Sequence, residues 1–134
     1  MGPVKVVIHY ANGKLLKGFT NDFFPNKSSI HVYPVDTGRD VKGTAVVVNQ
    51  LKALFFVKDF AGNPSYHDRK HFTEGRQGAG RKAEVTFADG EVLVGSTLGY
   101  DPNRPGFFIT PADMQSNNLR VFVVLSSVKK FRFL

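Results

Sequence analysis

The chain has 134 residues, no cysteine and a formal net charge of +7. Without cysteine there can be no disulfide and no thiolate metal site, so hydrophobic packing must hold the fold together. No apolar run is long enough to span a bilayer, and the start of the chain lacks the pattern of a signal peptide. We therefore expect a soluble, cytoplasmic protein with no membrane insertion.

The positive charge is spread along the chain rather than concentrated in one segment. Lysine and arginine outnumber aspartate and glutamate by 7 to 3 in residues 5–57, by 5 to 3 in residues 58–81 and by 6 to 5 in residues 82–134. A diffuse surplus of this kind is more typical of a solvated surface than of a nucleic-acid footprint. Charge alone therefore gives weak support for polyanion binding.

The chain contains an internal repeat at a constant offset of 77 positions. Residues 11–20 (ANGKLLKGFT) recur as residues 88–97 (ADGEVLVGST), and the same offset aligns residues 5–57 with residues 82–134 without a gap. Self-similarity at a fixed period indicates two copies of one supersecondary unit. We therefore predict two domains, at 5–57 and 82–134, joined by a basic, glycine-rich linker at 58–81.

Each copy begins with a predicted β-hairpin. Residues 5–10 are β-branched and aromatic and lead into Asn12-Gly13, and residues 84–87 lead into Asp89-Gly90. An Asn-Gly or Asp-Gly pair between apolar residues is the strongest short-range hairpin signal. Both copies are therefore expected to start with two antiparallel strands.

Two positions in the second strand of each hairpin define its geometry. Leu16 and Leu93 occupy the same place in the repeat, and one extra residue at the turn, a glycine bulge, would point both inward. Gly18 and Gly95 follow five residues after the turn glycine, where a missing side chain allows a sharp strand bend. We predict the bulge and the bend in both copies.

The rest of each copy reads as a loop, two strands, a short helical turn and a last strand. Residues 21–29 and 98–106 are rich in proline and asparagine, which are typical of turns. The predicted third strands are 30–33 and 107–110, the fourth 44–48 and 120–125, the helical turns 49–52 and 126–129, and the last strands 53–57 and 130–134.

Four aromatic or histidine side chains are expected to point outward, because their neighbours point inward. They are His31, Tyr33 and Phe55 in the first copy and Phe108 in the second. They could cover the contact between the two copies, since each small core needs covering. They could also form a stacking or partner surface.

No set of residues forms a recognisable catalytic or metal site. His67 and His71 have the spacing of some metal ligand pairs, but no third ligand is evident, and we expect solvated loop histidines. The glycine-rich residues 75–80 follow no predicted strand and precede no predicted helix, unlike a phosphate loop. No nucleophile, base and orienting group can be assembled. We expect no enzyme activity, no metal and no cofactor.

Five short strands with a helical turn before the fifth are typical of small β-barrels of the SH3 or Sm type. The predicted fold is all-β, with two tandem five-stranded barrels derived from an internal duplication. Residues 10–18 resemble the opening hairpin of Sm-like RNA chaperones, and residues 46–57 resemble their closing strand pair. That resemblance implies an RNA-binding module.

A second resemblance is to bacterial PilZ-type barrels, which are receptors for cyclic dinucleotides. Their marks are two arginines upstream of the barrel and an Asp/Asn-x-Ser-x-x-Gly turn between early strands. Arg76 and Arg81 precede the second copy, and Asp101, Asn103 and Gly106 occupy the turn, with asparagine at the serine position. The resemblance implies that these five residues form a ligand site on the second copy.

The repeats also resemble an uncharacterised bacterial domain found near signalling modules, which implies a regulatory role. The sequence thus predicts a non-enzymatic regulatory or adaptor module of bacterial signalling. Its ligand is expected to be a protein partner or a small phosphate-bearing molecule such as a cyclic dinucleotide. The alternative is an Sm-like RNA-binding module.

Overall fold

In the computed structural model the chain folds into ten β-strands and two single-turn 3-10 helices. The structure describes residues 4–34, 43–60, 80–112 and 117–134. The prediction of an all-β fold is therefore confirmed. The elements of the first half are β1 (Val4–Tyr10), β2 (Leu15–Thr20), β3 (Ser29–Pro34), β4 (Thr44–Val47), η1 (Val48–Gln50) and β5 (Leu51–Val57). Those of the second half are β6 (Arg81–Phe87), β7 (Val92–Thr97), β8 (Gly106–Pro111), β9 (Asn118–Val124), η2 (Leu125–Ser127) and β10 (Val128–Phe133).

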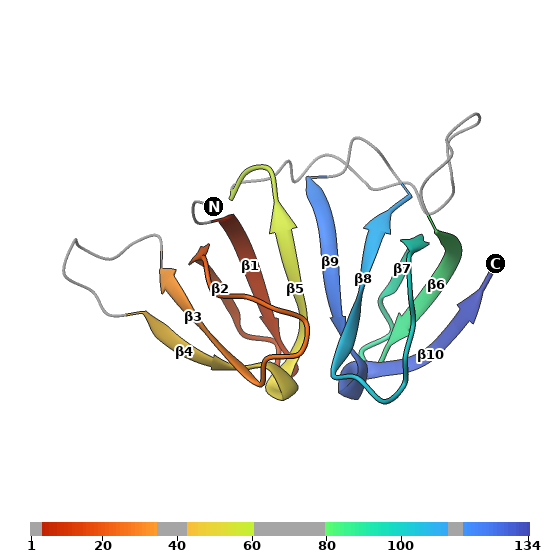
Figure 1. The fold of residues 1–134 in the computed structure, drawn as a ribbon, viewed down its shortest axis with the longest axis horizontal. Coiled ribbons are helices and arrows are strands. Elements are labelled where there is room, and N and C mark those ends of the chain that lie inside the picture. Colours follow the sequence, from red (N-terminus) through yellow and green to blue (C-terminus); the bar gives the residue numbers. More distant parts are fainter. Residues whose placement is uncertain (1–3, 35–42, 61–79, 113–116) are drawn as a thin grey trace.

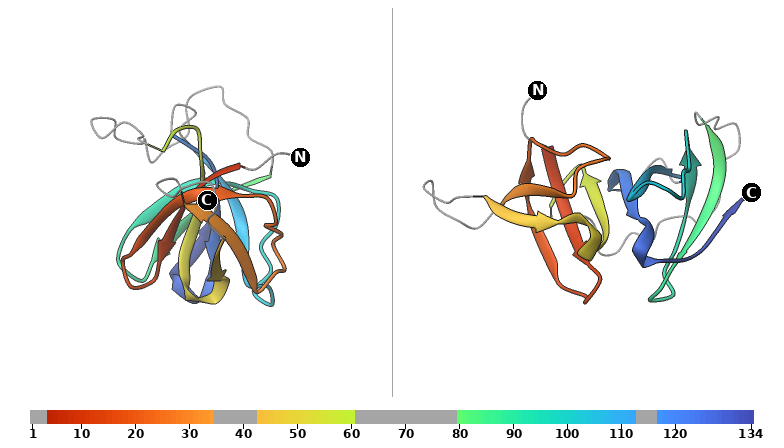
Figure 2. Two further views of the ribbon diagram at one scale, coloured as in Figure 1. Left: turned by 90° about the vertical axis from the view of Figure 1, so that its left-hand side faces the viewer. Right: turned by 60° about the horizontal axis from the view of Figure 1, so that its bottom comes forward.

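All ten strands belong to one antiparallel sheet, with the order β10-β6-β7-β8-β9-β5-β1-β2-β3-β4. Figure 1 shows β4 and β10 at its two ends, and Figure 2 shows how strongly each half is curved. Within each half the order is the same: the last strand, then the first, second, third and fourth. The sheet is continuous where two separate barrels were expected, because the fifth strand of the first half pairs with the fourth strand of the second.

The strand pair β5–β9, here called the seam, joins the halves through apolar residues. Its register places Ala53 opposite Val123, Leu54 opposite Phe122 and Phe55 opposite Val121. Hydrogen bonding along the strands satisfies the backbone groups that these side chains take out of water. The seam therefore buries both faces of β5, which is why this strand is an almost unbroken apolar run.

Polar contacts also tie the two halves together. The Lys52 Nζ lies 2.7 Å from Asp89 Oδ2 and 2.7 Å from Glu91 Oε1, across the boundary between the halves. The Ser127 hydroxyl, which is buried, donates to the Leu51 carbonyl oxygen at 2.9 Å. The halves therefore share hydrogen bonds and ion pairs as well as apolar contacts.

The core consists of two apolar clusters on opposite faces of the seam, because neighbouring residues of a strand point to opposite faces. Each cluster includes residues from both halves, so neither half encloses a core by itself. The first cluster contains Val6, Ile8, Ile30, Val32, Val46, Val48, Leu51, Leu54 and Phe56 with Phe122 and Val124. The second contains Ala83, Val85, Phe87, Leu93, Phe107, Ile109, Val121 and Val123 with Val7, Ala53, Phe55 and Val57.

The residues expected to point outward divide into two groups. Phe55 is 8% exposed and lies opposite Val121 of the second half, and the ring centre of Phe108 lies 5.9 Å from that of Phe56 in the first half, so both cover the contact between the halves. His31 is exposed and Tyr33 is 44% exposed, and neither contributes to that contact. The expectation of a covering role is confirmed for the two phenylalanines alone.

Both hairpin turns have the predicted glycine bulge. Gly13 and Gly90 each have a φ of +94°, and the Gly13 N–H donates to the Tyr10 carbonyl oxygen at 3.0 Å. A glycine in the left-handed region allows this extra residue at the turn. The resulting register places Ile8 opposite Leu16, as expected.

The helical turns start one residue earlier than predicted. The predicted ranges were 49–52 and 126–129, whereas the turns begin at Val48 and Leu125. The reason is that Leu51 and Val128 already belong to the last strands, where they pair with Tyr10 and Phe87. Among the residues of the described ranges, no helix is long and apolar enough to cross a membrane.

Candidate functional site

A pocket of about 720 Å³ opens beside the loop that connects β7 to β8. This volume lies within the range of roughly 300–1,000 Å³ that is usual for small-molecule sites. Most of the lining comes from the second half, and Pro25 adds a contribution from the β2–β3 loop. The lining residues are Pro25, Ser96, Thr97, Leu98, Gly99, Tyr100, Asp101, Arg104, Gly106, Phe107, Phe108, Thr110 and Arg120.

The loop at residues 101–106 is held by a turn that Asp101 organises. The Asp101 Oδ1 accepts the Asn103 N–H at 2.9 Å, and the Asp101 carbonyl oxygen accepts the Arg104 N–H at 3.1 Å. Proline at the second position of the turn, Pro102, fixes its backbone angle. The turn directs Arg104 to the pocket, with its Nε 3.7 Å from Asp101 Oδ2.

Gly106 begins β8 at a point where the backbone of β9 lies very close. A Cβ at this position would collide with the Val123 carbonyl oxygen and would lie 2.8 Å from the ring of Phe122. Glycine is therefore required for packing between the strands, whether or not a ligand approaches. Its place in the pocket wall follows from that packing.

Arg120, in β9, packs against two aromatic rings that also contact each other. Its guanidinium carbon lies 4.2 Å from the ring centre of Phe108 and 4.7 Å from that of Phe56. Cation–π contacts of this kind fix the position of the group without neutralising its charge. Within the described part of the chain Arg120 makes no ion pair, so its charge is available to a ligand at the pocket.

The remaining wall combines aromatic rings with hydroxyl groups. The ring centre of Tyr100 lies 5.3 Å from that of Phe107, in an edge-to-face contact, and 4.1 Å from that of Phe131, on which it stacks. Phe131 itself does not line the pocket. The hydroxyls belong to Ser96, Thr97, Tyr100 and Thr110, and that of Thr97 donates to the Gly99 carbonyl oxygen at 3.0 Å. Of the lining residues in the described ranges, none is a histidine, cysteine, lysine or glutamate.

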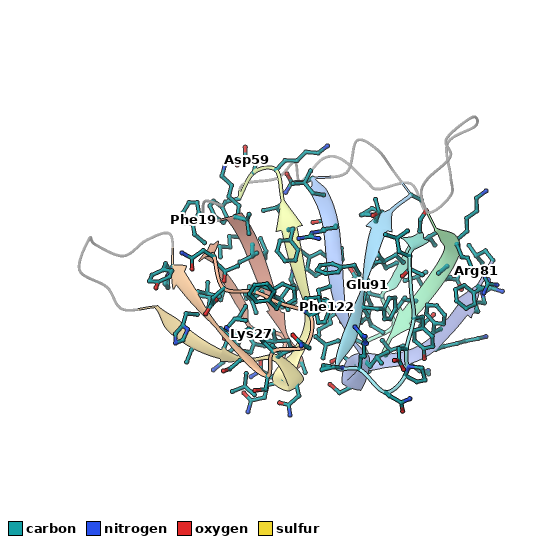
Figure 3. The ribbon with its side chains drawn as sticks, viewed as in Figure 1. Phe19, Lys27, Asp59, Arg81, Glu91 and Phe122 are labelled. Atoms are coloured by element: carbon teal, nitrogen blue, oxygen red, sulfur yellow. The ribbon has the colours of Figure 1, made fainter. Side chains whose placement is uncertain are left out.

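The structure brings together two of the five predicted site residues. Asp101 and Gly106 line the pocket, whereas Asn103 does not. Arg81 begins β6, and its guanidinium lies 3.7 Å from the ring centre of Phe133, away from the pocket; Figure 3 places it at the outer edge of the second half. Arg76 lies outside the described residues, as do His67, His71 and most of the predicted linker.

Sequence analysis missed the two arginines that do line the pocket. Arg104 lies inside the predicted turn itself, so the turn motif could have drawn attention to it. Arg120 corresponds to Gly43 at the 77-residue offset, and a charged residue present in one copy alone is a signal of a role outside the shared fold. The contact of Arg120 with two rings could not be predicted, because one of them belongs to the other half.

Comparison with known proteins gives a family and no function. No curated protein matches the chain, and no solved structure matches it. Residues 2–134 match a family of unknown function, DUF6982. Since that match covers almost the whole chain, the protein belongs to this family.

Proposed function

We propose that the protein is a non-enzymatic binding module of bacterial signalling whose pocket beside the β7–β8 loop takes a small phosphate-bearing ligand. The observation that carries this proposal is the presence of Arg104 and Arg120 in one pocket with aromatic walls. A cyclic dinucleotide has the required chemistry, since it combines phosphates with planar bases. Ligand binding would then regulate a protein partner, as expected of an adaptor.

Arginine suits this role because its planar guanidinium can donate two hydrogen bonds to one phosphate. Arg120 already packs against the rings of Phe56 and Phe108, so little conformational entropy is lost when it binds a ligand. Arg104 is near Asp101 at 3.7 Å, a distance that leaves its N–H groups available for a stronger contact. Two arginines and one carboxylate, Asp101, line the pocket, so its charged side chains have a net positive charge that favours an anionic ligand.

The shape and walls of the pocket support a nucleotide rather than inorganic phosphate. A volume of about 720 Å³ is far larger than one phosphate requires. The rings of Tyr100, Phe107 and Phe108 offer faces or edges for base contact. The hydroxyl groups of Ser96, Tyr100 and Thr110 can donate to base or sugar oxygens.

We further infer that the two halves are copies of one five-stranded SH3-like barrel unit, produced by duplication. The identical strand order, the matching glycine turns and the equivalent 3-10 turns support this origin. On this view the first copy retained the fold while the second acquired the pocket. The first copy has Gly43 where the second has Arg120, which agrees with that division.

Isothermal titration calorimetry with cyclic di-GMP tests the ligand proposal. The intact chain should bind, and an Arg104→Ala, Arg120→Ala double variant should bind at least about tenfold more weakly, the change that roughly 1.4 kcal/mol produces. Arg81→Ala is the matched control, since this arginine lies away from the pocket, and it should bind like the intact chain. No heat with the intact chain, or equal affinity of all three proteins, would contradict the proposal.

A salt titration separates this function from the alternative of an Sm-like RNA-binding module. A ligand with two phosphates should show a shallow dependence of affinity on salt, because few counterions are released. An oligoribonucleotide that contacts many cations should show a steep one. Tight, steeply salt-dependent binding of RNA without binding of the dinucleotide would favour the alternative.

A further inference from the structure

Strand β10 has the same place in the second half that β5 has in the first. β5 lies beside β1 and receives β9 on its other edge, whereas β10 lies beside β6 at the end of the sheet. Figure 1 shows its outer edge facing away from the other strands. In the ranges that the structure describes, no strand pairs with that edge, so its backbone groups can accept another strand.

β5 and β10 differ in the side chains at the positions that, in β5, pair with β9. In the seam, Ala53 and Phe55 are buried opposite Val123 and Val121. The residues 77 positions later are Lys130 and Arg132, and both are exposed. A strand that pairs with β10 in the register of the seam would therefore face two cations in place of two apolar side chains.

A second copy of the chain does not fit this edge. The strand equivalent to β9 is β4, and the seam register would place its Thr44 opposite Arg132 and its Val46 opposite Lys130. The ion pairs of Lys52 would also be lost, because Lys129 would face Lys14, which replaces Glu91 in the first copy. Lysine on an edge strand commonly protects a protein from pairing with itself.

The opposite face of β10 is aromatic and only partly covered. The ring centres of Phe131 and Phe133 lie 5.0 Å apart. Tyr100 already stacks on Phe131, and the Arg81 guanidinium lies 3.7 Å from the ring centre of Phe133, which stays 39% exposed. The equivalents of the two phenylalanines in β5, Leu54 and Phe56, are buried against Phe122 of the paired strand. An added strand with apolar residues on this face would cover the part of Phe133 that is still exposed.

The cations remain able to bind carboxylates. Arg132 donates from Nε and Nη2 to Glu84 at 2.9 Å and 3.2 Å, which leaves other N–H groups of its guanidinium for a second acceptor. Lys129 and Lys130 are exposed and make no ion pair within the described ranges. Along the edge, Lys130 and Arg132 thus alternate with Phe131 and Phe133, and Lys129 lies next to them at the register shift between Val128 and Lys130.

We propose that β10 is the docking edge for an extended segment of an acidic partner protein, which adds to the sheet as an antiparallel strand. Backbone hydrogen bonds would provide the pairing, and the alternating side chains would provide the selectivity. Carboxylates of the partner would face Lys130 and Arg132, and its apolar residues would face Phe131 and Phe133. No residue of β10 is among the lining residues of the pocket, so docking at this edge does not require the proposed ligand.

Synthetic peptides derived from the sequence of β9 test this proposal, because β9 already pairs with the equivalent edge. A fluorescent peptide of residues 118–124 with V121E and V123E places glutamates opposite Arg132 and Lys130 in the seam register. A matched peptide with V121K and V123K has the same length and the same opposite face, in which Phe122 would lie opposite Phe131 and Arg120 opposite Phe133. Fluorescence anisotropy should show at least about tenfold tighter binding of the acidic peptide, and that difference should fall as salt screens the charges.

Charge-reversing substitutions in β10 should reverse the preference for the acidic peptide over the lysine peptide. A Lys130→Glu, Arg132→Glu double variant should prefer the lysine peptide, and Lys130→Glu alone, which keeps the Arg132–Glu84 pair, should reduce the difference between the peptides. Circular dichroism checks that each variant is folded. Equal binding of both peptides, or an unchanged preference in the folded variants, would overturn the proposal.

Two further controls separate strand addition from simple charge attraction and from self-association. An acidic peptide with N-methyl groups on alternate backbone nitrogens cannot pair along the strand and should lose binding. If it binds as well as the parent peptide, charge attraction alone is responsible and strand addition is wrong. Light scattering should show a monomer, and a concentration-dependent oligomer that Lys130→Glu dissociates would identify a second copy as the occupant instead.

Discussion

At the scale of single residues, Asp22 shows what sequence reasoning cannot reach. Its carboxylate lies in the β2–β3 loop and accepts the His31 N–H at 3.1 Å, with the His31 Nδ1 at 3.0 Å and the Thr20 hydroxyl at 3.1 Å. The segment was predicted as a loop and no more. These partners come together through the pairing of β2 with β3, which no local motif in the loop indicates.

The pKa of Asp22 makes its contribution measurable. Partial burial raises this pKa, but hydrogen bonds from His31 and Thr20 outweigh that effect and lower it to about 2. Because the folded pKa is below the unfolded value, the stabilisation is present above about pH 4 and is lost as the pH falls toward 2. Asp22→Asn should therefore lower the free energy of unfolding by about 1–2 kcal/mol at neutral pH and by almost nothing near pH 2. Urea denaturation at both pH values checks this, and an equal loss at both would rule out the ionised carboxylate as the cause.

The candidate site was predictable at this scale only where a turn motif was present. Asp101 and Gly106 belong to such a motif, and both line the pocket. The proposed role of Arg81 rested on its position before the second copy, but its side chain packs on Phe133. Stacking of an arginine depends on which rings the fold brings near it, and that is a property of the tertiary structure.

At the scale of elements, strand positions were predictable because alternation and turn residues are local signals. The bend at Gly18 and Gly95 was expected on the same grounds, and the structure adds a physical reason for glycine. A Cβ on Gly18 would lie 2.5 Å from the Tyr33 carbonyl oxygen, and one on Gly95 would collide with the Thr110 carbonyl oxygen. Close approach of the third strand of each half, rather than bending alone, excludes a side chain.

Alanine substitutions can test whether close approach of the third strand or bending of the second strand requires glycine. If close approach is the cause, Gly18→Ala and Gly95→Ala should each destabilise the fold by about 1–3 kcal/mol, and the valine variants by more. Gly99→Ala is the matched control, because a Cβ there meets nothing within 4 Å, and its melting temperature should hardly change. Thermal denaturation followed by circular dichroism compares the three positions. Alanine variants as stable as the parent chain would show that only branched side chains are excluded.

At the scale of the whole molecule, the repeat was visible in the sequence and the seam was not. The seam joins β5 to β9, and the repeat by itself does not say which edges of two equivalent units will meet. A signal did exist in the unequal copies. Phe55 in β5 is apolar, whereas Arg132, at the same place of the repeat in β10, is charged. This difference is expected if β5 is buried on both faces and β10 on one face.

The central claim is that two halves, each with an incomplete core, fold as one cooperative unit through the seam. Differential scanning calorimetry tests it most directly, because it compares the measured enthalpy of unfolding with the van't Hoff enthalpy from the shape of the transition. A shared core predicts a single transition in which the two enthalpies agree. Two separate transitions, or a measured enthalpy about twice the van't Hoff value, would contradict the claim and indicate halves that unfold independently.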